Sequence, residues 1–221
     1  MNNFKAIIFD FDGVLLESIE VKKEAFRKLF KDYPADIDKI VEYHMEKGGV
    51  SRYKKFEYIY KEILHQELTS EKSEELGRLF SQYALDGVLR APFVKGAEEF
   101  LERHYKTLDL FVASGTPERE MRFIVNNLGM DRFFKAVYGS PALKGEIALK
   151  ILEENQYKPS EVIFVGDAIS DWEGAQRAKI CFLGRIHQCY SDPFKNLDQT
   201  NKINDLSELE NKLREKRIIL L

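Results

Sequence analysis

The chain has 221 residues, of which 44% are hydrophobic and 32% are charged, so it can bury a core and remain in solution. This composition excludes a disordered or collagen-like protein, and no apolar run approaches the roughly 18 residues that a membrane-spanning helix needs. Lys and Arg number 34 against 37 Asp and Glu, a net charge of −3, so no basic excess favours nucleic acid as a partner.

The first predicted element is a strand over residues 4–9, where an apolar run ends at Asp10. Charged residues interrupt this N-terminal stretch, which argues against a signal peptide. The two cysteines, Cys181 and Cys189, are too few for a disulfide framework. We therefore expect a cytoplasmic protein that does not contact the membrane.

Residues 16–90 form a second region, which is rich in Lys and Glu and contains no convincing strand. Its apolar residues recur at helical spacing, so we predict an all-helical insertion after the first strand. Gly48-Gly49 interrupts this region, and Ser51 is expected to cap the helix that follows. Pro92 marks the expected hinge where the chain leaves the insertion.

Beyond residue 91, predicted strands and helices alternate. The strands are expected over residues 108–113, 136–138, 162–165 and 180–183, and the helices over residues 97–104, 117–128, 146–154 and 171–178. Strands that are apolar on both faces suit a parallel sheet with helices on each side, so the predicted fold class is α/β with a doubly wound parallel sheet. We predict a core domain of residues 1–15 and 91–221, into which residues 16–90 are inserted as a helical domain.

Two acidic residues, Asp10 and Asp12, directly follow the first predicted strand. Residues two apart in an extended segment face the same side, so both carboxylates can point into one site, and Gly13 lets the chain turn after them. Neighbouring carboxylates repel each other unless a cation or a shared proton lies between them, which favours a divalent metal. The alternative is that the two acids cap the following turn.

A second acidic cluster, Asp167 and Asp171, follows the predicted strand over residues 162–165. Carboxylate oxygens suit Mg²⁺, which usually takes one or two carboxylates from a segment. Asp171 could also be a helix-start acid that the helix dipole favours, and the two roles are compatible. Because ligands bind beyond the carboxyl ends of parallel strands, we expect Asp10, Ser114 and Asp167 to meet at one edge of the sheet.

The segment Ser114-Gly115-Thr116 ends the predicted strand over residues 108–113 and opens a helix. A hydroxyl and free backbone N–H groups at a helix start form an anion site. Thr116 is expected to cap the helix, which leaves Ser114 as the better phosphate ligand. Lys144 lies in the loop after the next predicted strand in the chain. A lone lysine in a loop is usually solvated, and only the closeness of its strand in sequence to the one that bears Ser114 favours Lys144 as a phosphate ligand.

Taken in order, these residues resemble the four motifs of the haloacid dehalogenase superfamily: Asp10-x-Asp12-Gly13, Ser114, Lys144 and Gly166-Asp167-x-x-x-Asp171. The insertion resembles the α-helical cap of that superfamily, as in phosphoglycolate phosphatases and β-phosphoglucomutases. The resemblance covers essentially the whole chain and implies a Rossmann-like core.

The resemblance also implies a role for each residue. Asp10 would be the nucleophile that forms an aspartyl-phosphate, and Asp12 would be the general acid and base. The phosphoryl oxygens would be bound by Ser114, Gly115 and Lys144. Mg²⁺ would be held by four residues: Asp10, Asp12 through its backbone carbonyl, Asp167 and Asp171.

The residues present favour one reaction of the superfamily. Its dehalogenases and phosphonoacetaldehyde hydrolases lack the second acid, which is Asp12 here. Its sugar phosphomutases carry a histidine shortly after the first motif, whereas residues 15–31 contain no histidine. We expect a Mg²⁺-dependent phosphatase that acts on a small phosphorylated metabolite; the alternatives are a sugar phosphomutase and a non-catalytic protein that binds a phosphometabolite.

Substrate selectivity is expected to come from the insertion. Arg52 could bind a carboxylate or a second phosphate, or it could be a solvated residue at a helix start. The histidines show no metal-ligand spacing: His44, His65, His104 and His187. The apolar residues 218–221 are expected to pack on the core or to form an oligomer contact, so a monomer and a homodimer both remain open.

Overall fold

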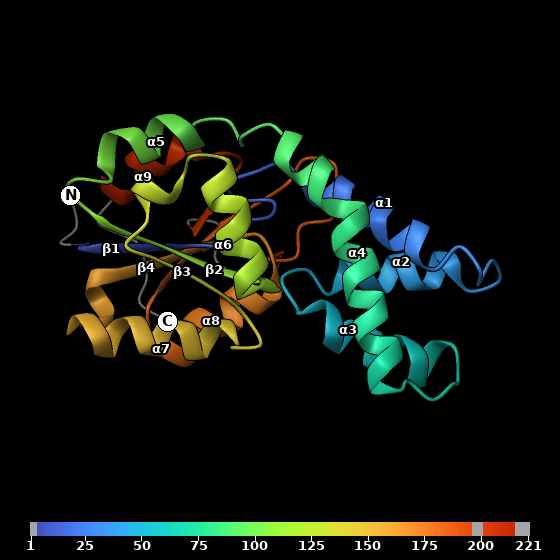
Figure 1. Ribbon diagram of the computed structural model, residues 1–221. Helices are drawn as coiled ribbons and strands as arrows, with labels where there is room; N and C mark the ends of the chain where they lie inside the picture. Colours follow the sequence, from blue (N-terminus) through green and yellow to red (C-terminus); the bar gives the residue numbers. More distant parts are fainter. Residues whose placement is uncertain (1–3, 196–200, 215–221) are drawn as a thin grey trace.

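A computed structural model describes residues 4–195 and 201–214 of the chain and contains a six-stranded parallel sheet (Figure 1). The strand order is β3-β2-β1-β4-β5-β6, which confirms the predicted doubly wound α/β fold. The strands are β1 Ala6–Phe9, β2 Asp109–Pro117, β3 Ala136–Ser140, β4 Val162–Gly166, β5 Cys181–Arg185 and β6 Lys202–Ile203. All five predicted strands are present, and only the two-residue strand β6 was not predicted.

Two helical layers cover the sheet: α5 Ala97–His104, α6 Glu118–Asn127 and α9 Leu209–Arg214 on one face, and α7 Lys144–Asn155 and α8 Ile169–Ala178 on the other (Figure 1). Side chains alternate between the two faces of the central strand β1. Ile7 and Phe9 pack with α5, α6 and α9, whereas Ala6 and Ile8 pack with α7 and α8. All four residues are fully buried, which is why the strand is apolar on both faces.

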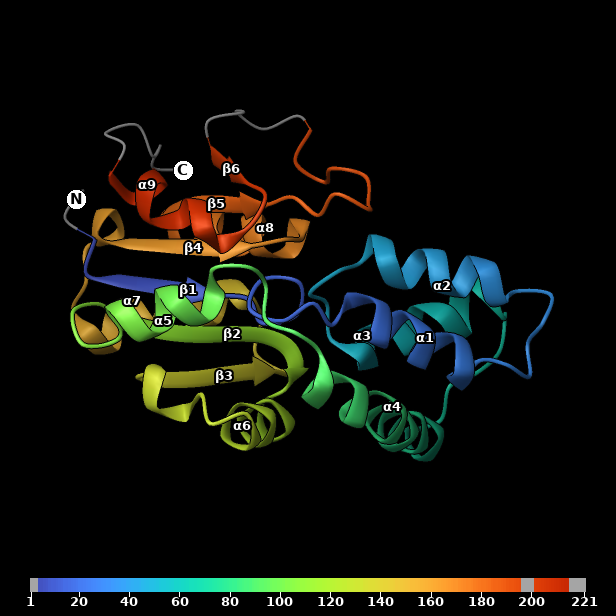
Figure 2. The same cartoon turned by 90° about the horizontal axis from the view of Figure 1, so that it is seen from above.

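The remaining helices come from the predicted insertion and lie beyond the carboxyl ends of the strands (Figure 2). They are α1 Ile19–Leu29, α2 Ile37–Glu46, α3 Arg52–Tyr58, which continues as a π-helical segment Ile59–Ile63, and α4 Ser70–Arg90. Helix α1 packs against both α2 and α4. Phe26, Phe30 and Phe56 pack together in the core of this bundle, where each is at most 1% exposed.

The two connections between the sheet and the bundle run side by side. The N–H of Glu17 donates a hydrogen bond to the carbonyl oxygen of Pro92 at 2.9 Å. The N–H of Val94 donates to the carbonyl oxygen of Leu15, also at 2.9 Å. The connections therefore form a two-stranded link, and the predicted hinge residue Pro92 lies within it.

The predicted helix cap at Thr116 is wrong. Strand β2 continues to Pro117, and helix α6 begins at Glu118 with no side-chain capping bond. The Thr116 hydroxyl instead accepts a hydrogen bond from Nζ of Lys22, at 2.8 Å. The Thr116 hydroxyl, which the sequence pattern assigned to the start of the helix, is therefore bound by Lys22 of the bundle.

Three further expectations concern the cysteines, membrane-spanning helices and the C-terminal residues. Cys181 and Cys189 are both free. In the part of the chain that the structure describes, no helix has both the length and the apolar character needed to cross a membrane. The expected packing of residues 218–221 lies outside the described residues.

Candidate active site

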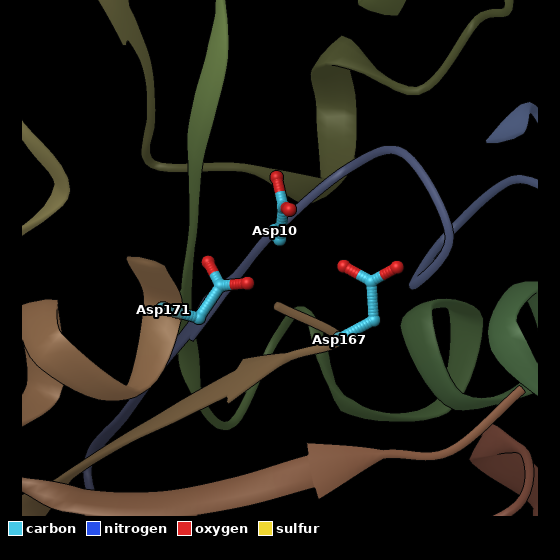
Figure 3. Close-up of side chains that lie close together, drawn as sticks. All are labelled: Asp10, Asp167 and Asp171. Carbon is cyan, nitrogen blue, oxygen red and sulfur yellow. The ribbon is translucent and has the colours of Figure 1, made fainter. Parts of the chain in front are cut away.

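Three carboxylates meet at the carboxyl edge of the sheet (Figure 3). Asp10 follows β1, Asp167 follows β4, and Asp171 lies in the first turn of α8. Each residue offers one carboxylate oxygen, and these three atoms all lie within 4.8 Å of one another. Strands β1 and β4 are neighbours in the sheet, so the residues that follow them are brought together as predicted.

Lys144 faces this three-carboxylate cluster from the first residue of α7. It is only 6% exposed, so the alternative of a solvated lysine is wrong. Its Nζ donates to Oδ2 of Asp10 at 2.8 Å and also to Asp171. One positive charge against three carboxylates leaves an excess of negative charge, and an all-oxygen donor set of this kind fits Mg²⁺.

The protonation of the cluster reflects the same excess of negative charge. Burial raises the pKa of Asp167 well above its usual range, and the charges of Asp10 and Asp171 raise it further. Burial raises the pKa of Asp171 to about 7, although the charge of Lys144 acts in the opposite direction. Asp171 also accepts a hydrogen bond from the N–H of Ala168 at 3.0 Å, so it serves the helix start as well as the cluster.

The carboxylate of Asp12 contacts the start of the bundle. The Ser18 hydroxyl donates to Oδ1 of Asp12 at 2.7 Å, and Nζ of Lys22 forms an ion pair with Oδ2. Burial raises the pKa of Asp12, but the charge and hydrogen bond of Lys22, with the hydrogen bond of Ser18, bring it below its usual value. Asp12 is therefore held as a carboxylate by residues of α1 and its N-terminus.

Two glycines allow the chain to approach this site closely. Gly13 has a φ of +76°, and a Cβ there would lie 2.2 Å from Oδ2 of Asp167. Gly49 has a φ of +69°, and a Cβ there would lie 2.5 Å from Nζ of Lys144 and 2.3 Å from Oγ of Ser170. The loop between α2 and α3 can therefore press against the sheet edge at Gly49.

A cavity of about 410 Å³ lies between the sheet edge and the bundle. Asp10, Asp12 and Asp167 line it from the sheet side. The bundle contributes both charged and apolar lining residues, including Lys22, Phe26, His44, Arg52, Lys55 and Phe80. This volume and mixture of side chains are typical of a site for a small molecule.

The three predicted phosphate ligands, Ser114, Gly115 and Lys144, differ in whether they line this cavity. Gly115 lines it directly. Ser114 and Lys144 are buried and are not among the lining residues, although Lys144 contacts Asp10, which does line the cavity. The Ser114 hydroxyl accepts a hydrogen bond from the N–H of Thr116 at 3.1 Å.

Arg52 lines the cavity but is not a solvated residue, since it is only 4% exposed. Its guanidinium donates two hydrogen bonds to Glu120 on α6, Nη2 to Oε1 at 2.7 Å and Nη1 to Oε2 at 3.0 Å. Nη1 also donates to the Ser81 hydroxyl on α4 at 2.6 Å. Arg52 therefore ties the bundle to the helical layer of the sheet.

Several basic residues around the cavity were given no role in the site from the sequence. Lys22, Lys55 and His187 line it. Arg185, at the end of β5, forms an ion pair with Glu17 in the connection at 2.6 Å. A charged residue in a helix or loop is usually solvated, so no local pattern distinguishes these residues.

Lys55 leads to the first testable prediction. Burial, with the charges of Lys22 and Lys144, lowers the pKa of the Lys55 ammonium to about 7, so between pH 7 and about 10 the unfolded chain binds more protons there. The free energy of unfolding of the wild type, relative to Lys55→Met, should therefore rise over this window, by up to about 1 kcal/mol per pH unit. Denaturant titrations at a series of pH values measure this difference.

The matched control is Lys54→Met, on the same helix but exposed. Its stability should follow that of the wild type at every pH. If the free energy of unfolding of the wild type, relative to that of Lys55→Met, stayed constant from pH 7 to 10, the prediction would be wrong.

Comparison with known proteins gives a consistent picture. A family model for haloacid dehalogenase-like hydrolases matches residues 7–185. A phosphorylated carbohydrates phosphatase of Thermotoga maritima is 28% identical over 190 residues, which cover 80% of this chain and 82% of that protein. A phosphoglycolate phosphatase of Vibrio parahaemolyticus is 27% identical over 225 aligned positions, which cover 94% of this chain and 95% of that protein.

Solved structures share the fold at lower identity. A hydrolase from Pseudomonas syringae matches with a TM-score of 0.78 at 21% identity, covering 96% of this chain and 99% of that one. This likeness concerns the arrangement of the sheet and the helices. It agrees with the strand order and layers described above.

Proposed function

Because the chain belongs to the haloacid dehalogenase-like hydrolase family, we propose that it is a Mg²⁺-dependent phosphatase that hydrolyses a small phosphomonoester through an aspartyl-phosphate. The observation that carries this proposal is the meeting of Asp10, Lys144, Asp167 and Asp171 beside a cavity of metabolite size. The names of the two relatives, both phosphatases of phosphorylated small molecules, support the same reaction class.

Asp10 is the proposed nucleophile. One of its carboxylate oxygens would attack phosphorus, and the bond between phosphorus and the leaving oxygen would break as the new bond forms. Lys144, whose Nζ lies 2.8 Å from Oδ2 of Asp10, would offset the negative charge that gathers as the phosphate approaches. Ser114 and Gly115 are proposed to bind the non-bridging oxygens together with Lys144.

Asp12 is the proposed general acid and base. It is a carboxylate in this structure, so it would take up a proton as the substrate binds and give that proton to the leaving oxygen in the first step. In the second step it would take a proton from the attacking water, which releases phosphate and restores Asp10. Its position two residues after Asp10, and its place in the lining of the same cavity, support this role. Ser18 and Lys22 would keep the carboxylate oriented between the two steps.

Mg²⁺ is proposed to be held by Asp10, Asp167, Asp171 and the backbone carbonyl of Asp12. When bound, the ion would supply Lewis-acid chemistry and offset the negative charge of the phosphoryl group. The excess of carboxylate charge over Lys144 supports a divalent cation at this position.

Residues 16–90 are proposed to act as a cap over a core of residues 1–15 and 91–221. The hydrogen bond from the Ser170 hydroxyl to the carbonyl oxygen of Gly48, at 3.0 Å, supports contact between the two parts at the site. Movement about the paired connections would admit substrate, and closure would exclude bulk water. Arg52 is proposed to form part of the substrate-facing wall of the cap.

Phosphate release from a panel of small phosphomonoesters tests the proposed function. We expect release in the presence of Mg²⁺ and a fall to background in excess chelator, because the carboxylate cluster requires a cation to accept a phosphate dianion. A folded protein that released no phosphate from any compound would reject the proposal. An isomeric sugar phosphate that accumulated faster than free phosphate would identify a phosphomutase instead.

A further inference from the structure

Lys55 is a buried lysine in the wall of the substrate cavity. It lies on α3, is only 4% exposed and lines the same cavity as Asp10. Its Nζ donates to the carbonyl oxygen of His44 at 3.0 Å and lies 3.2 Å from Nδ1 of the same residue. Both partners are formally neutral groups, because burial and neighbouring cations lower the pKa of His44 well below its usual value.

The other cations at the site differ from Lys55 in one respect. Lys22 is paired with Asp12, Arg52 with Glu120, and Lys144 with Asp10 and Asp171. Lys55 forms no ion pair with any residue in the ranges 4–195 and 201–214. A buried ammonium without a nearby negative charge is unfavourable, which is why the pKa of Lys55 falls to about 7, and a group that supplied a negative charge would favour the ammonium again.

The surroundings of Lys55 do not supply that charge. Its Nζ lies 5.8 Å from the centre of the Phe26 ring, on which His44 is stacked at 3.8 Å. The two acidic residues that α2 contributes to the cavity lining, Glu42 and Glu46, are exposed, and neither pairs with Lys55. The groups nearest to Nζ of Lys55 are therefore neutral, and the other cations that line the cavity, Lys22 and Arg52, already have carboxylate partners.

We propose that Lys55 binds a second anionic group of the substrate, a carboxylate or a second phosphate on the organic part. The substrate class is then a small phosphomonoester that carries a further negative charge away from the phosphate that Asp10 attacks. This inference rests on the proposed function and extends it, because it assigns the recognition of the organic part to Lys55. Arg52, whose donors are occupied by Glu120, is left to hold the cap against α6.

Matched substrate pairs test this inference in the Mg²⁺-loaded protein. 2-Phosphoglycolate and 2-hydroxyethyl phosphate differ only in a carboxylate, and 1,3-propanediol bisphosphate and 3-hydroxypropyl phosphate differ only in a second phosphate. We expect the wild type to favour the more anionic member of at least one pair in kcat/KM by about 10- to 100-fold, the range for a hydrogen bond to a charged group. The pair with the larger ratio identifies the anion as a carboxylate or a phosphate.

Lys55→Met keeps most of the length of the side chain and removes its charge, so the ratio should fall to within about 3-fold of unity. Lys55→Gln, which keeps a donor for the His44 carbonyl, should lose the ratio in the same way, so the result does not depend on one variant folding well. Lys54→Met, on the exposed side of the same helix, should keep the wild-type ratio. An unchanged ratio in both Lys55 variants, or no preference in the wild type, would overturn the inference.

Binding measurements separate this inference from the proposed function. Calorimetric titration of each compound into the Asp10→Asn protein, with and without Lys55→Met, measures its binding affinity in the absence of turnover. A preference for the anionic compound that requires Lys55 would support the inference even if no compound were hydrolysed, in which case only the phosphatase assignment would fail. Equal binding of both members of each pair would overturn the role of Lys55 while leaving phosphate release unaffected.

Discussion

Asp10→Asn is expected to lower Mg²⁺-dependent phosphate release by a factor of about 10⁴ or more, the scale seen when an enzyme loses its nucleophile. An amide cannot form the acyl phosphate, and its single oxygen can accept only one of the two hydrogen bonds that the Asp10 carboxylate receives, from Phe11 at Oδ1 (2.7 Å) and from Lys144 at Oδ2 (2.8 Å). Replacement also removes one of three clustered carboxylates, so the protein should remain folded. Phosphate release and circular dichroism of the same preparation measure the two effects.

Asp86→Asn is the matched control for this substitution, because Asp86 is exposed on α4, where it pairs with Arg90. Its activity should equal that of the wild type. If Asp10→Asn kept more than about 1% of wild-type turnover on its best substrate, Asp10 could not be the nucleophile.

Lys144→Met is expected to lower the free energy of unfolding by about 3–5 kcal/mol in the absence of Mg²⁺, the range for removing one partner of a buried ion pair. Asp10 and Asp171 would then remain buried without their cation. The loss should be larger at pH 8 than at pH 5, because the Asp171 carboxyl group, whose pKa burial raises to about 7, can take up a proton at the lower pH. Denaturant titration at both pH values measures it.

Lys150→Met serves as the control on the same helix, since Lys150 is about half exposed and its ion pair with Glu154 is long, at 3.8 Å. We expect a change below about 0.5 kcal/mol there, as for other surface pairs. A Lys144→Met protein as stable as Lys150→Met would show that the cluster does not depend on its lysine.

The sheet and its carboxylates were predictable because a parallel strand that is buried on both faces leaves a clear apolar run. β1 and β4 end close to where their apolar runs end, and Asp10 and Asp167 follow them directly, whereas β2 continues to Pro117 and contains Ser114. Parallel order then brings these residues to one edge without further information. β6 escaped prediction because Lys202 and Ile203 are too few to show a pattern.

For the bundle side of the cavity, the helices could be predicted from the sequence, but the partners of its charged side chains could not. Arg52 binds Glu120, and Lys22 binds Thr116, across long stretches of chain. Such pairs depend on how the bundle sits on the sheet, and hydrophobic periodicity carries no information about that placement. The same reason explains why Lys55 reads as an ordinary surface lysine in the sequence and yet is buried at the cavity.

The position of the insertion within the sheet also bears on how the chain folds. β1 is a central strand, but its first partner along the chain is β2, where Ala6 pairs with Asp109. A loop of about 100 residues must therefore close before β1 is covered, whereas the helices α1 to α4 find their partners within one continuous segment. During synthesis the bundle can form early. The apolar strand β1 stays unpaired until β2 and β4 have been synthesised, and an unpaired apolar strand is prone to aggregate.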